Sequence, residues 1–353
     1  MSHLSHRPVF SRFRRTILAL ALTASAALLG QSAKAEDVPL ISGGVGFFSN
    51  TNGGNTTYIP VISPLLSAPI GSRFLIEGRA NFSESFSPRF GPQPGYTGSP
   101  FLALTYLQGD FIVSPHLTIV GGAFLTPFAT YNERLTPIWI SNFQDGPLIF
   151  PLGTMNSGQG IGGMLRGSAI SRAKYSVDYA AYYSATTTGK SFNSQESSGG
   201  RASIYFPDAG LEVGASYGHR LVGPQQNFEG FHVWWEPLDS PFRLRSEYAH
   251  GAHSQGYWIE TDYRLSHFGG PASVIGRLEP VFRVQQTFRN SPDSTDGLPA
   301  ADTQRGDFGL DYHLPHEVRI DTSYSRQFSS TGNVNSWETG IVYRFLFPTW
   351  KGK

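Results

Sequence analysis

The sequence has no cysteine, few lysines and a low proportion of charged residues. Without cysteine, disulfide bonds and thiolate metal sites are excluded, so an exported chain must gain its stability in another way. Charged residues make up 15% of the sequence, well below the roughly one quarter usual for globular proteins. After residue 35 no apolar run is long enough for a membrane-spanning helix. Glycine (40 residues) and aromatic residues (14%) are abundant, which suits either a lipid-facing barrel or a secreted β-sandwich.

The N-terminal segment predicts export. Residues 1–15 carry four arginines and no acidic residue, the apolar run TILALALTASAALLG follows, and small residues stand at 33–35. This order predicts a signal peptide over residues 1–35, because the apolar run is too short for a spanning anchor. Its removal takes away five of the 27 Lys and Arg and none of the 26 Asp and Glu, which leaves a formal charge of −4 on residues 36–353. The composition therefore gives no reason to expect nucleic acid as a partner.

Alternation with a period of two residues is the main structural signal. It runs through VRIDTSYSR (318–326), WETGIVYRF (337–345) and YWIETDYR (257–264), where apolar or aromatic residues alternate with charged and small ones. Because successive side chains of a strand face opposite sides, each segment has one apolar face and one charged face. A soluble sandwich turns the apolar face inward, whereas an outer-membrane barrel turns it toward lipid. Alternation alone therefore leaves both folds open.

The connections between strands distinguish the two folds. About sixteen strands are predicted, near residues 41–49, 57–63, 72–82, 101–112, 117–125, 161–171, 175–185, 199–206, 211–220, 228–237, 241–250, 255–264, 274–287, 304–313, 317–327 and 336–346. Short connections fall at 114–116, 171–174, 207–210, 238–240 and 315–317, and long ones at 83–100, 126–160, 186–198 and 288–303. Short turns at one rim and long loops at the other are typical of bacterial outer-membrane barrels. We therefore predict an all-β protein, a single-domain antiparallel transmembrane β-barrel in the bacterial outer membrane.

Residues 126–160 connect the fifth and sixth predicted strands and interrupt the regular pattern. The stretch FLTPFATYNERLTPIWI (124–140) has two prolines, a Glu133–Arg134 pair and an aromatic tail. Irregular backbone at membrane depth is tolerated where it lines a water-filled cavity, and proline supports a non-strand path. We predict that residues 126–160 fold into the barrel, with Glu133, Arg134 and Asp145 at a constriction. The alternative is an ordinary outer loop with a buried Glu–Arg pair.

The stretch 102–140 carries a family resemblance. A hairpin with a short turn leads into a Gly-x-Phe-x-x-Pro-Phe run, formed by Gly122, Phe124, Pro127 and Phe128. This part of the sequence resembles the phosphate-selective porin O/P group and its relatives. The resemblance implies a sixteen-stranded, homotrimeric channel in outer-membrane lipid, through which small hydrophilic solutes or ions diffuse. Phosphate selectivity is not implied, because the anion-selective members have lysine- and arginine-rich lumens and this chain has few lysines.

The charges predicted to face the barrel interior nearly cancel. The densest basic group comprises Arg243, Arg245, Arg277 and Arg283. These residues can form a ladder for anions, or they can form plain cross-strand ion pairs with neighbours such as Glu247 and Glu279. Both interpretations stay open at this point, and weak net ion selectivity is expected.

An enzymatic alternative rests on the stretch HGAHSQ. It puts His250, His253 and Ser254 at a barrel rim, where an outer-membrane hydrolase would hold its active site. Nucleophilic catalysis needs a base within hydrogen-bond reach of the nucleophile, and no motif of that kind is evident. We therefore predict no catalytic residue, no metal site and no cofactor. A secreted, soluble β binding protein is the third alternative.

Overall fold

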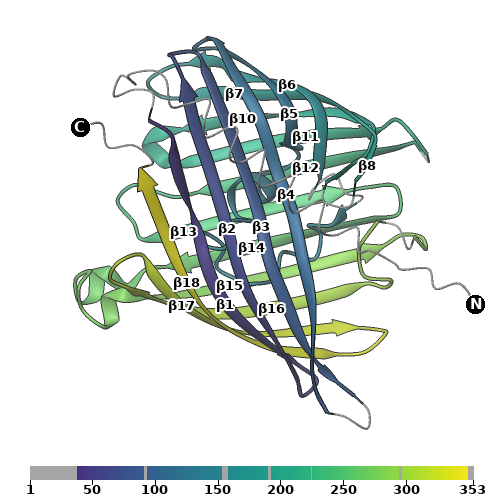
Figure 1. The fold of residues 1–353 in the computed structure, drawn as a ribbon, viewed down its shortest axis with the longest axis vertical. Coiled ribbons are helices and arrows are strands. Elements are labelled where there is room, and N and C mark those ends of the chain that lie inside the picture. The colour runs from purple at the N-terminus through teal and green to yellow at the C-terminus, as the bar shows by residue number, and fades with distance from the viewer. Residues whose placement is uncertain are drawn as a thin grey trace, which may run out of the picture.

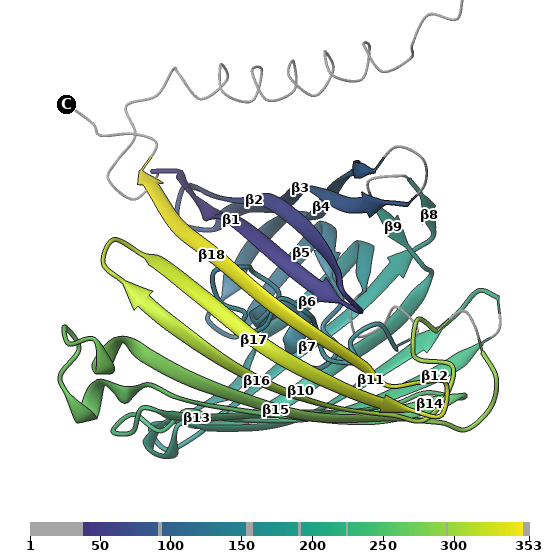
Figure 2. The same cartoon turned by 90° about the horizontal axis from the view of Figure 1, so that it is seen from below.

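The computed structural model describes residues 38–90, 94–152, 158–189, 192–223, 225–293 and 296–348. Sixteen strands form one closed antiparallel barrel, and two further short strands form a separate sheet (Figures 1 and 2). The predicted all-β barrel and its strand number are confirmed. Residues 1–35, the predicted signal peptide, lie outside the described part of the chain. Among the described residues, no helix is long and apolar enough to cross a membrane.

The barrel strands follow one another in chain order, and the first and last strands pair to close the ring. The first eight are β1 (Leu40–Asn52), β2 (Asn55–Ile70), β3 (Phe74–Arg89), β4 (Gly95–Ser114), β5 (Leu117–Leu125), β6 (Gln159–Ser171), β7 (Ser176–Ala185) and β10 (Ser197–Phe206). The others are β11 (Leu211–Arg220), β12 (Gln226–Trp235), β13 (Phe242–His250), β14 (Ser254–Tyr263), β15 (Leu278–Arg289), β16 (Thr303–Leu314), β17 (Val318–Ser329) and β18 (Val334–Pro348). The remaining elements are β8 (Thr187–Thr188), β9 (Asn193–Ser194), α2 (Tyr131–Arg134), η2 (Pro207–Ala209), η3 (Leu265–Phe268) and η4 (Ile275–Arg277).

The outer and inner faces of the barrel differ in polarity. On β17, Ile320, Tyr324 and Phe328 are 37%, 38% and 44% exposed, whereas Asp321 and Ser325 on the opposite face are buried. An exposed apolar outer face with a polar interior is the reverse of a soluble β-sandwich, and it matches a barrel surrounded by lipid. The soluble alternative is therefore excluded by the direction in which the strands face.

β4 shows the same polarity, although the sequence leaves its facing ambiguous. Gln108 and Asp110 are buried, while Leu107 and Phe111 are 48% and 44% exposed. The polar side chains of β4 thus point into the barrel and its apolar side chains point outward, as they do on β17.

The two rims of the barrel carry different connections. One rim carries residues 71–73, 115–116, 172–175, 207–210, 236–241, 264–277 and 315–317. The other rim carries residues 53–54, 90–94, 126–158, 186–196, 221–225, 251–253, 290–302 and 330–333. The predicted short turns all lie on the first rim, which we call the turn rim. The contrast is weaker than expected, because the turn rim includes the long connection 264–277 and the other rim includes the short connection 53–54.

β3 and β4 are longer than the sequence predicts. The expected loop over residues 83–100 is wrong for most of its length, because the two strands pair as far as Arg89 and Gly95. Serine and proline in this stretch have low strand propensity, but hydrogen bonding to a neighbouring strand overrides local propensity. The hairpin connection shrinks to residues 90–94.

Candidate functional site in the barrel lumen

The connection between β5 and β6 packs inside the ring of strands (Figure 2). We call its described part, residues 126–152, the inner segment. One buried apolar cluster joins this segment to the barrel wall: Phe128, Ala129, Tyr131, Leu135, Ile149 and Leu152 with Phe228, Ala249 and Trp258. Burial of each large apolar side chain contributes about 1.5–3 kcal/mol. Packing therefore holds the inner segment against the inner face of β12, β13 and β14.

Glu247 on β13 fixes the start of the inner segment. Its side chain is buried, and Oε1 accepts hydrogen bonds from the Thr130 N–H at 2.6 Å, the Thr130 hydroxyl at 2.8 Å and the Tyr131 N–H at 2.6 Å. Oε2 accepts from Trp258 Nε1 at 3.2 Å. Thr130 is the N-cap of α2, so the carboxylate satisfies N–H groups that a helix start leaves free. Burial raises the pKa of the Tyr131 phenol to about 12.

Glu133 and Arg134, predicted to lie at a constriction, both reach the barrel wall. Glu133 Oε2 lies 2.5 Å from Arg201 Nη1 on β10. Arg134 donates to both carboxylate oxygens of Glu212 on β11, at 2.8 and 3.1 Å, in the bidentate geometry that makes such pairs strong. The two side chains nevertheless stay 24% and 37% exposed. They attach α2 to β10 and β11 and keep part of their surface open.

Asn142 and Leu148 attach the second half of the inner segment to β14 and β15. Asn142 Nδ2 donates to Glu260 Oε1 at 3.0 Å and to Asp262 Oδ2 at 3.2 Å. The backbone N–H of Leu148 donates to Gln285 Oε1 at 2.6 Å. These bonds give a non-strand backbone the partners that it needs inside a barrel, where unpaired polar groups are costly.

Asp145 lies between these two attachments and carries the most open charge of the inner segment. It forms an ion pair with Arg305 on β16, at 3.1 Å, and its side chain is 44% exposed. The backbone carbonyl of Asp145 accepts from Arg283 Nη2 at 2.9 Å. The guanidinium of Arg283 also lies over the ring of Phe143, 4.5 Å from its centroid. The backbone at Asp145 is therefore fixed while its carboxylate stays accessible.

The middle of the inner segment extends to the opposite side of the lumen. Arg79 Nη2 on β3 donates to the Thr136 hydroxyl at 2.8 Å. Arg319 Nη2 on β17 donates to the backbone carbonyls of Ile138 and Ser141. The segment thus contacts the wall on β3 and β17 as well as on β10 to β16, so it crosses the interior instead of lining one side only.

Gly44 on β1 lies against this crossing. A Cβ atom at Gly44 would lie 2.9 Å from Ile138 Cγ1 and 2.9 Å from Trp139 Cε3. We expect Gly44→Val to destabilise the folded barrel by about 1–3 kcal/mol, the usual cost of overpacking, seen as a lower midpoint of the heat-dependent gel shift. Gly121→Val is the matched control, since a Cβ there has no neighbour within 4 Å. Equal midpoints for the two variants would contradict the contact.

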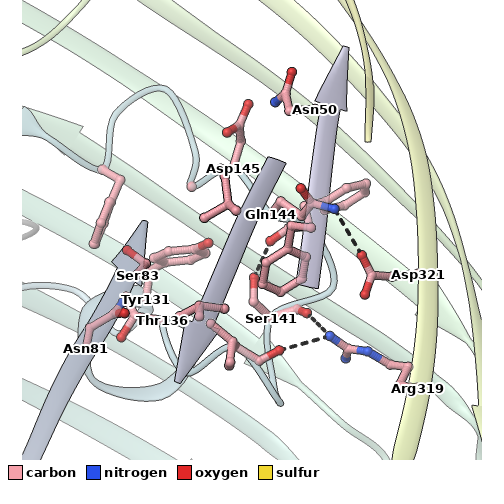
Figure 3. Close-up of a pocket in the computed structure, with 17 residues that line it drawn as sticks. Asn50, Asn81, Ser83, Tyr131, Thr136, Ser141, Gln144, Asp145, Arg319 and Asp321 are labelled. Carbon is pink, nitrogen blue, oxygen red and sulfur yellow. Dashed lines mark hydrogen bonds between the residues drawn. The ribbon is translucent and has the colours of Figure 1, made fainter. Parts of the chain in front are cut away.

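A cavity of about 310 Å³ lies between the inner segment and the wall (Figure 3). Its wall side is formed by Phe48, Asn50, Ile59, Val61, Asn81, Ser83, Arg319 and Asp321, and its other side by Tyr131, Thr136, Ile138, Ser141, Phe143, Gln144, Asp145, Gly146 and Phe150. Of the three predicted constriction charges, Asp145 lines this cavity, and Glu133 and Arg134 are not among its lining residues. We call it the central cavity.

Two further cavities adjoin the central cavity. One, of about 100 Å³, shares Asn50 and Asp145 with it and lies toward the rim opposite the turn rim. The other, of about 850 Å³, shares Arg319 with it and opens at the turn rim. Charged and histidine residues of the larger cavity are Arg243, Arg245, Arg264, Arg319, Arg344, His267, His313, Glu236, Asp239 and Glu279. Cavities that share lining residues therefore follow the inner segment from one rim toward the other.

The predicted lumen arginines, apart from Arg277, lie on inward faces and form ion pairs, and so does Glu279, whereas Glu247 is hydrogen-bonded to the inner segment. Arg243 pairs with Asp262 and Glu279. Arg245 pairs with Glu236 at 2.6 Å, and Arg283 pairs with Asp307 at 2.9 Å. These contacts correspond to the cross-strand ion pairs that the sequence left as one of two interpretations.

Arg277 is the exception. The sequence places it on a strand that begins at residue 274, but it ends η4 in the long connection 264–277, and β15 starts only at Leu278. The glycine-rich stretch before it turns back on itself, with the Gly276 Cα beside the Gly270 carbonyl, so no extended strand can form there. Arg277 therefore takes no part in the row of inward charges.

The rim residues proposed for hydrolysis have separate partners. Ser254 Oγ donates to Asp296 Oδ2 at 2.8 Å, and His253 Nδ1 lies 2.6 Å from Ser291 Oγ. In the Ser-His-Asp arrangement the serine nucleophile has a histidine as its hydrogen-bond partner. Within the described part of the chain, Ser254 instead donates to a carboxylate, so these residues do not form that arrangement.

Several residues that hold or line the site were missed by sequence reasoning. Arg305 and Gln285 lie on the inward faces of their strands, in step with Asp307 and Arg283. The same alternation that located those neighbours would have found them. Asn81, in contrast, carries no charge and gives no signal of its own, because an inward asparagine looks like any polar residue on a strand.

The comparisons with known proteins agree on the fold. No family model and no curated protein matches the sequence. Among solved structures, the fold is similar to Salmonella typhi OmpF in complex with daunomycin, with a TM-score of 0.58, 12% identity, and 89% of this chain and 99% of that chain covered. It is also similar to the Comamonas acidovorans anion-selective porin, with a TM-score of 0.53, 10% identity, and 87% and 98% covered. The trimer form of Vibrio cholerae OmpT gives a TM-score of 0.52, 12% identity, and 88% and 100% covered.

At these identities the likeness concerns the fold alone. The general porin fold that the sequence resemblance implied is confirmed, while membership of the phosphate-selective O/P group stays a prediction. The closed ring, the apolar outer face and the polar interior are those of an outer-membrane protein. The chain is therefore an outer-membrane β-barrel with the sixteen-stranded fold of porins.

Proposed function

We propose that the protein is a passive diffusion channel for small hydrophilic or ionic solutes, narrowed by the inner segment. The observation that carries the proposal is the series of cavities along that segment, which share lining residues and extend from one rim toward the other. Diffusion through such a lumen needs no covalent chemistry and no cofactor. Asp145, Glu133 and Arg134 are the charges of the inner segment that solutes would meet, because each keeps an exposed side chain.

The row of paired charges suggests little net ion selectivity. Inward arginines and carboxylates compensate each other across neighbouring strands, so the field that remains is local. The larger cavity at the turn rim has more arginines than carboxylates among its lining residues. A weak preference for anions at that end is the expected result.

We further propose that the barrel assembles as a homotrimer. Support comes from the sequence resemblance to trimeric porins and from the trimer form in which the structurally similar Vibrio cholerae OmpT is described. Chemical cross-linking of the detergent-extracted protein tests it: a ladder ending at three subunits is expected, and a single monomer band would contradict it.

Single-channel recording in a planar bilayer tests the channel itself. Residues 132–146 are replaced by a short glycine-serine linker. We expect discrete conductance steps for the wild type and steps about twofold larger or more for the deletion, because the deleted residues cross the lumen. The reversal potential under a salt gradient reports the sign of any selectivity.

A matched control replaces residues 330–333, a short connection on the same rim as the inner segment, with glycines. Its conductance should equal that of the wild type. Absence of steps from a barrel that folds and shows the heat-dependent gel shift would refute the channel. If the deletion variant shows conductance steps of wild-type size, the proposed narrowing by the inner segment is refuted, while the channel function stands.

A further inference from the structure

Each charged side chain that lines the central cavity already has a partner on the inner segment or the barrel wall. Arg319 donates to two backbone carbonyls of the inner segment and lies 3.5 Å from Asp311. Asp145 is paired with Arg305 at 3.1 Å. Asp321 Oδ2 lies 3.4 Å from Gln144 Nε2 (Figure 3). Since each charge already has a partner that holds the inner segment in place, an ionic solute gains little by replacing one.

Neutral hydrogen-bonding groups fill most of the remaining polar lining. They are Asn50, Asn81, Ser83, Thr136, Ser141 and Gln144. Asn81 Oδ1 is buried and has no hydrogen-bond partner within the described part of the chain. The buried Asp321 likewise keeps Oδ1 without a side-chain donor there. Both atoms are acceptors, and buried acceptors favour a ligand that brings hydroxyl or amide donors.

Glycines pack against the rings of two aromatic residues in the lining of the cavity, Phe48 and Phe143. The ring of Phe48 lies against Gly46 and Gly340, where a Cβ would fall 3.1 and 2.3 Å from its atoms. The ring of Phe143 lies against Gly309 and under the Arg283 guanidinium. Phe143 is 3% exposed and the Arg283 guanidinium covers its ring, so the rigid apolar face that remains for a solute is that of Phe48. Apolar faces combined with a few fixed polar groups are the usual composition of a small-molecule site.

The size of the cavity suits a small ligand. Its volume of about 310 Å³ lies at the lower end of the roughly 300–1,000 Å³ usual for small-molecule pockets. We propose that the central cavity is a binding site for a neutral, polyhydroxylated solute of monosaccharide size. Hydroxyl groups of the solute donate to Asn81 and Asp321, and its C–H face lies on the Phe48 ring. This inference rests on the proposed channel function and names the class of solute for which the channel has a site.

The test is the ion current through single channels at constant KCl while D-glucose is added. A site in the lumen gives a reversible, saturable decrease in current. Asn81→Leu removes the free acceptor, and we expect its half-saturating glucose concentration to rise about tenfold, the factor typical of one lost hydrogen bond. Gln108→Leu is the matched control, because Gln108 is an inward amide on β4 that does not line the cavity.

Phe48→Leu provides a second variant in case Asn81→Leu does not fold; it removes a ring and leaves every polar group. It too should raise the half-saturating concentration, while Gln108→Leu should not. Sodium gluconate, an anion of similar size, should decrease the current less than glucose does. A linear, unsaturable decrease, stronger inhibition by gluconate, or equal effects of Asn81→Leu and Gln108→Leu would overturn the site. If one of these results is found in channels that still show discrete conductance steps, the binding site is refuted and the proposed channel function stands. If no steps are seen, the channel function itself is refuted.

Discussion

Glu247→Leu should release the start of the inner segment and raise single-channel conductance. The substitution removes the acceptor of the Thr130 N–H, the Thr130 hydroxyl and the Tyr131 N–H in one step. Each buried donor left without a partner costs about 1–3 kcal/mol. The substitution therefore destabilises the docked position of α2 by more than its remaining ion pairs to β10 and β11 stabilise it. We expect conductance to rise about twofold, with rapid current fluctuations, because the segment then moves in the lumen.

Two further variants serve as controls for Glu247→Leu. Glu247→Gln keeps an oxygen acceptor in place of the carboxylate, so its effect should be smaller than that of Glu247→Leu. Glu229→Leu removes an exposed glutamate of the adjacent strand β12, and its conductance should match the wild type. If Glu247→Leu folds and conducts as the wild type does, Glu247 does not control the position of the inner segment.

The barrel could be predicted from the sequence because one rule applies to every strand. Alternation places Asp321 inward and Ile320 outward without any knowledge of the neighbouring strand, and lipid on one side forces the same rule on each strand. Alternation does not predict where a strand ends, because hydrogen bonding to the neighbouring strand determines its length. β3 and β4 continue through serine and proline to Arg89 and Gly95 because each supplies the partner of the other.

The site was harder to predict because its contacts join residues far apart in the sequence. The prolines and the Glu133–Arg134 pair mark the inner segment as unusual, but nothing local shows that Glu133 meets Arg201 and Arg134 meets Glu212. Glu247 looked like one half of an ordinary cross-strand ion pair, whereas it caps α2. Side chains that serve a distant backbone carry no local signature, because their partners depend on the path of the loop.

Arg283 makes the largest expected contribution to stability. Its side chain is 0% exposed, and it lies 2.9 Å from Asp307 and 3.7 Å from Glu260 while it donates to the Asp145 carbonyl. Arg283→Met keeps most of the volume but leaves two buried carboxylates short of a counter-charge. Removing one partner of a buried ion pair costs about 3–5 kcal/mol. We expect a clearly lower midpoint of urea unfolding, measured by the gel shift of the folded barrel in one detergent.

Two companion variants separate lost charge from lost packing. Glu260→Gln in the Arg283→Met background removes a buried carboxylate that has lost one of its two arginine partners, so it should restore part of the lost stability, although Glu260→Gln alone should destabilise the barrel. Such a change of sign is expected only if the two side chains interact directly. Arg326→Met on β17, an exposed arginine beside the Phe328 ring, should stay within about 0.5 kcal/mol of the wild type. If Arg283→Met unfolds at the same urea concentration as Arg326→Met, the inner segment is held by its apolar cluster and by Glu247. The buried ion pairs then contribute little to stability.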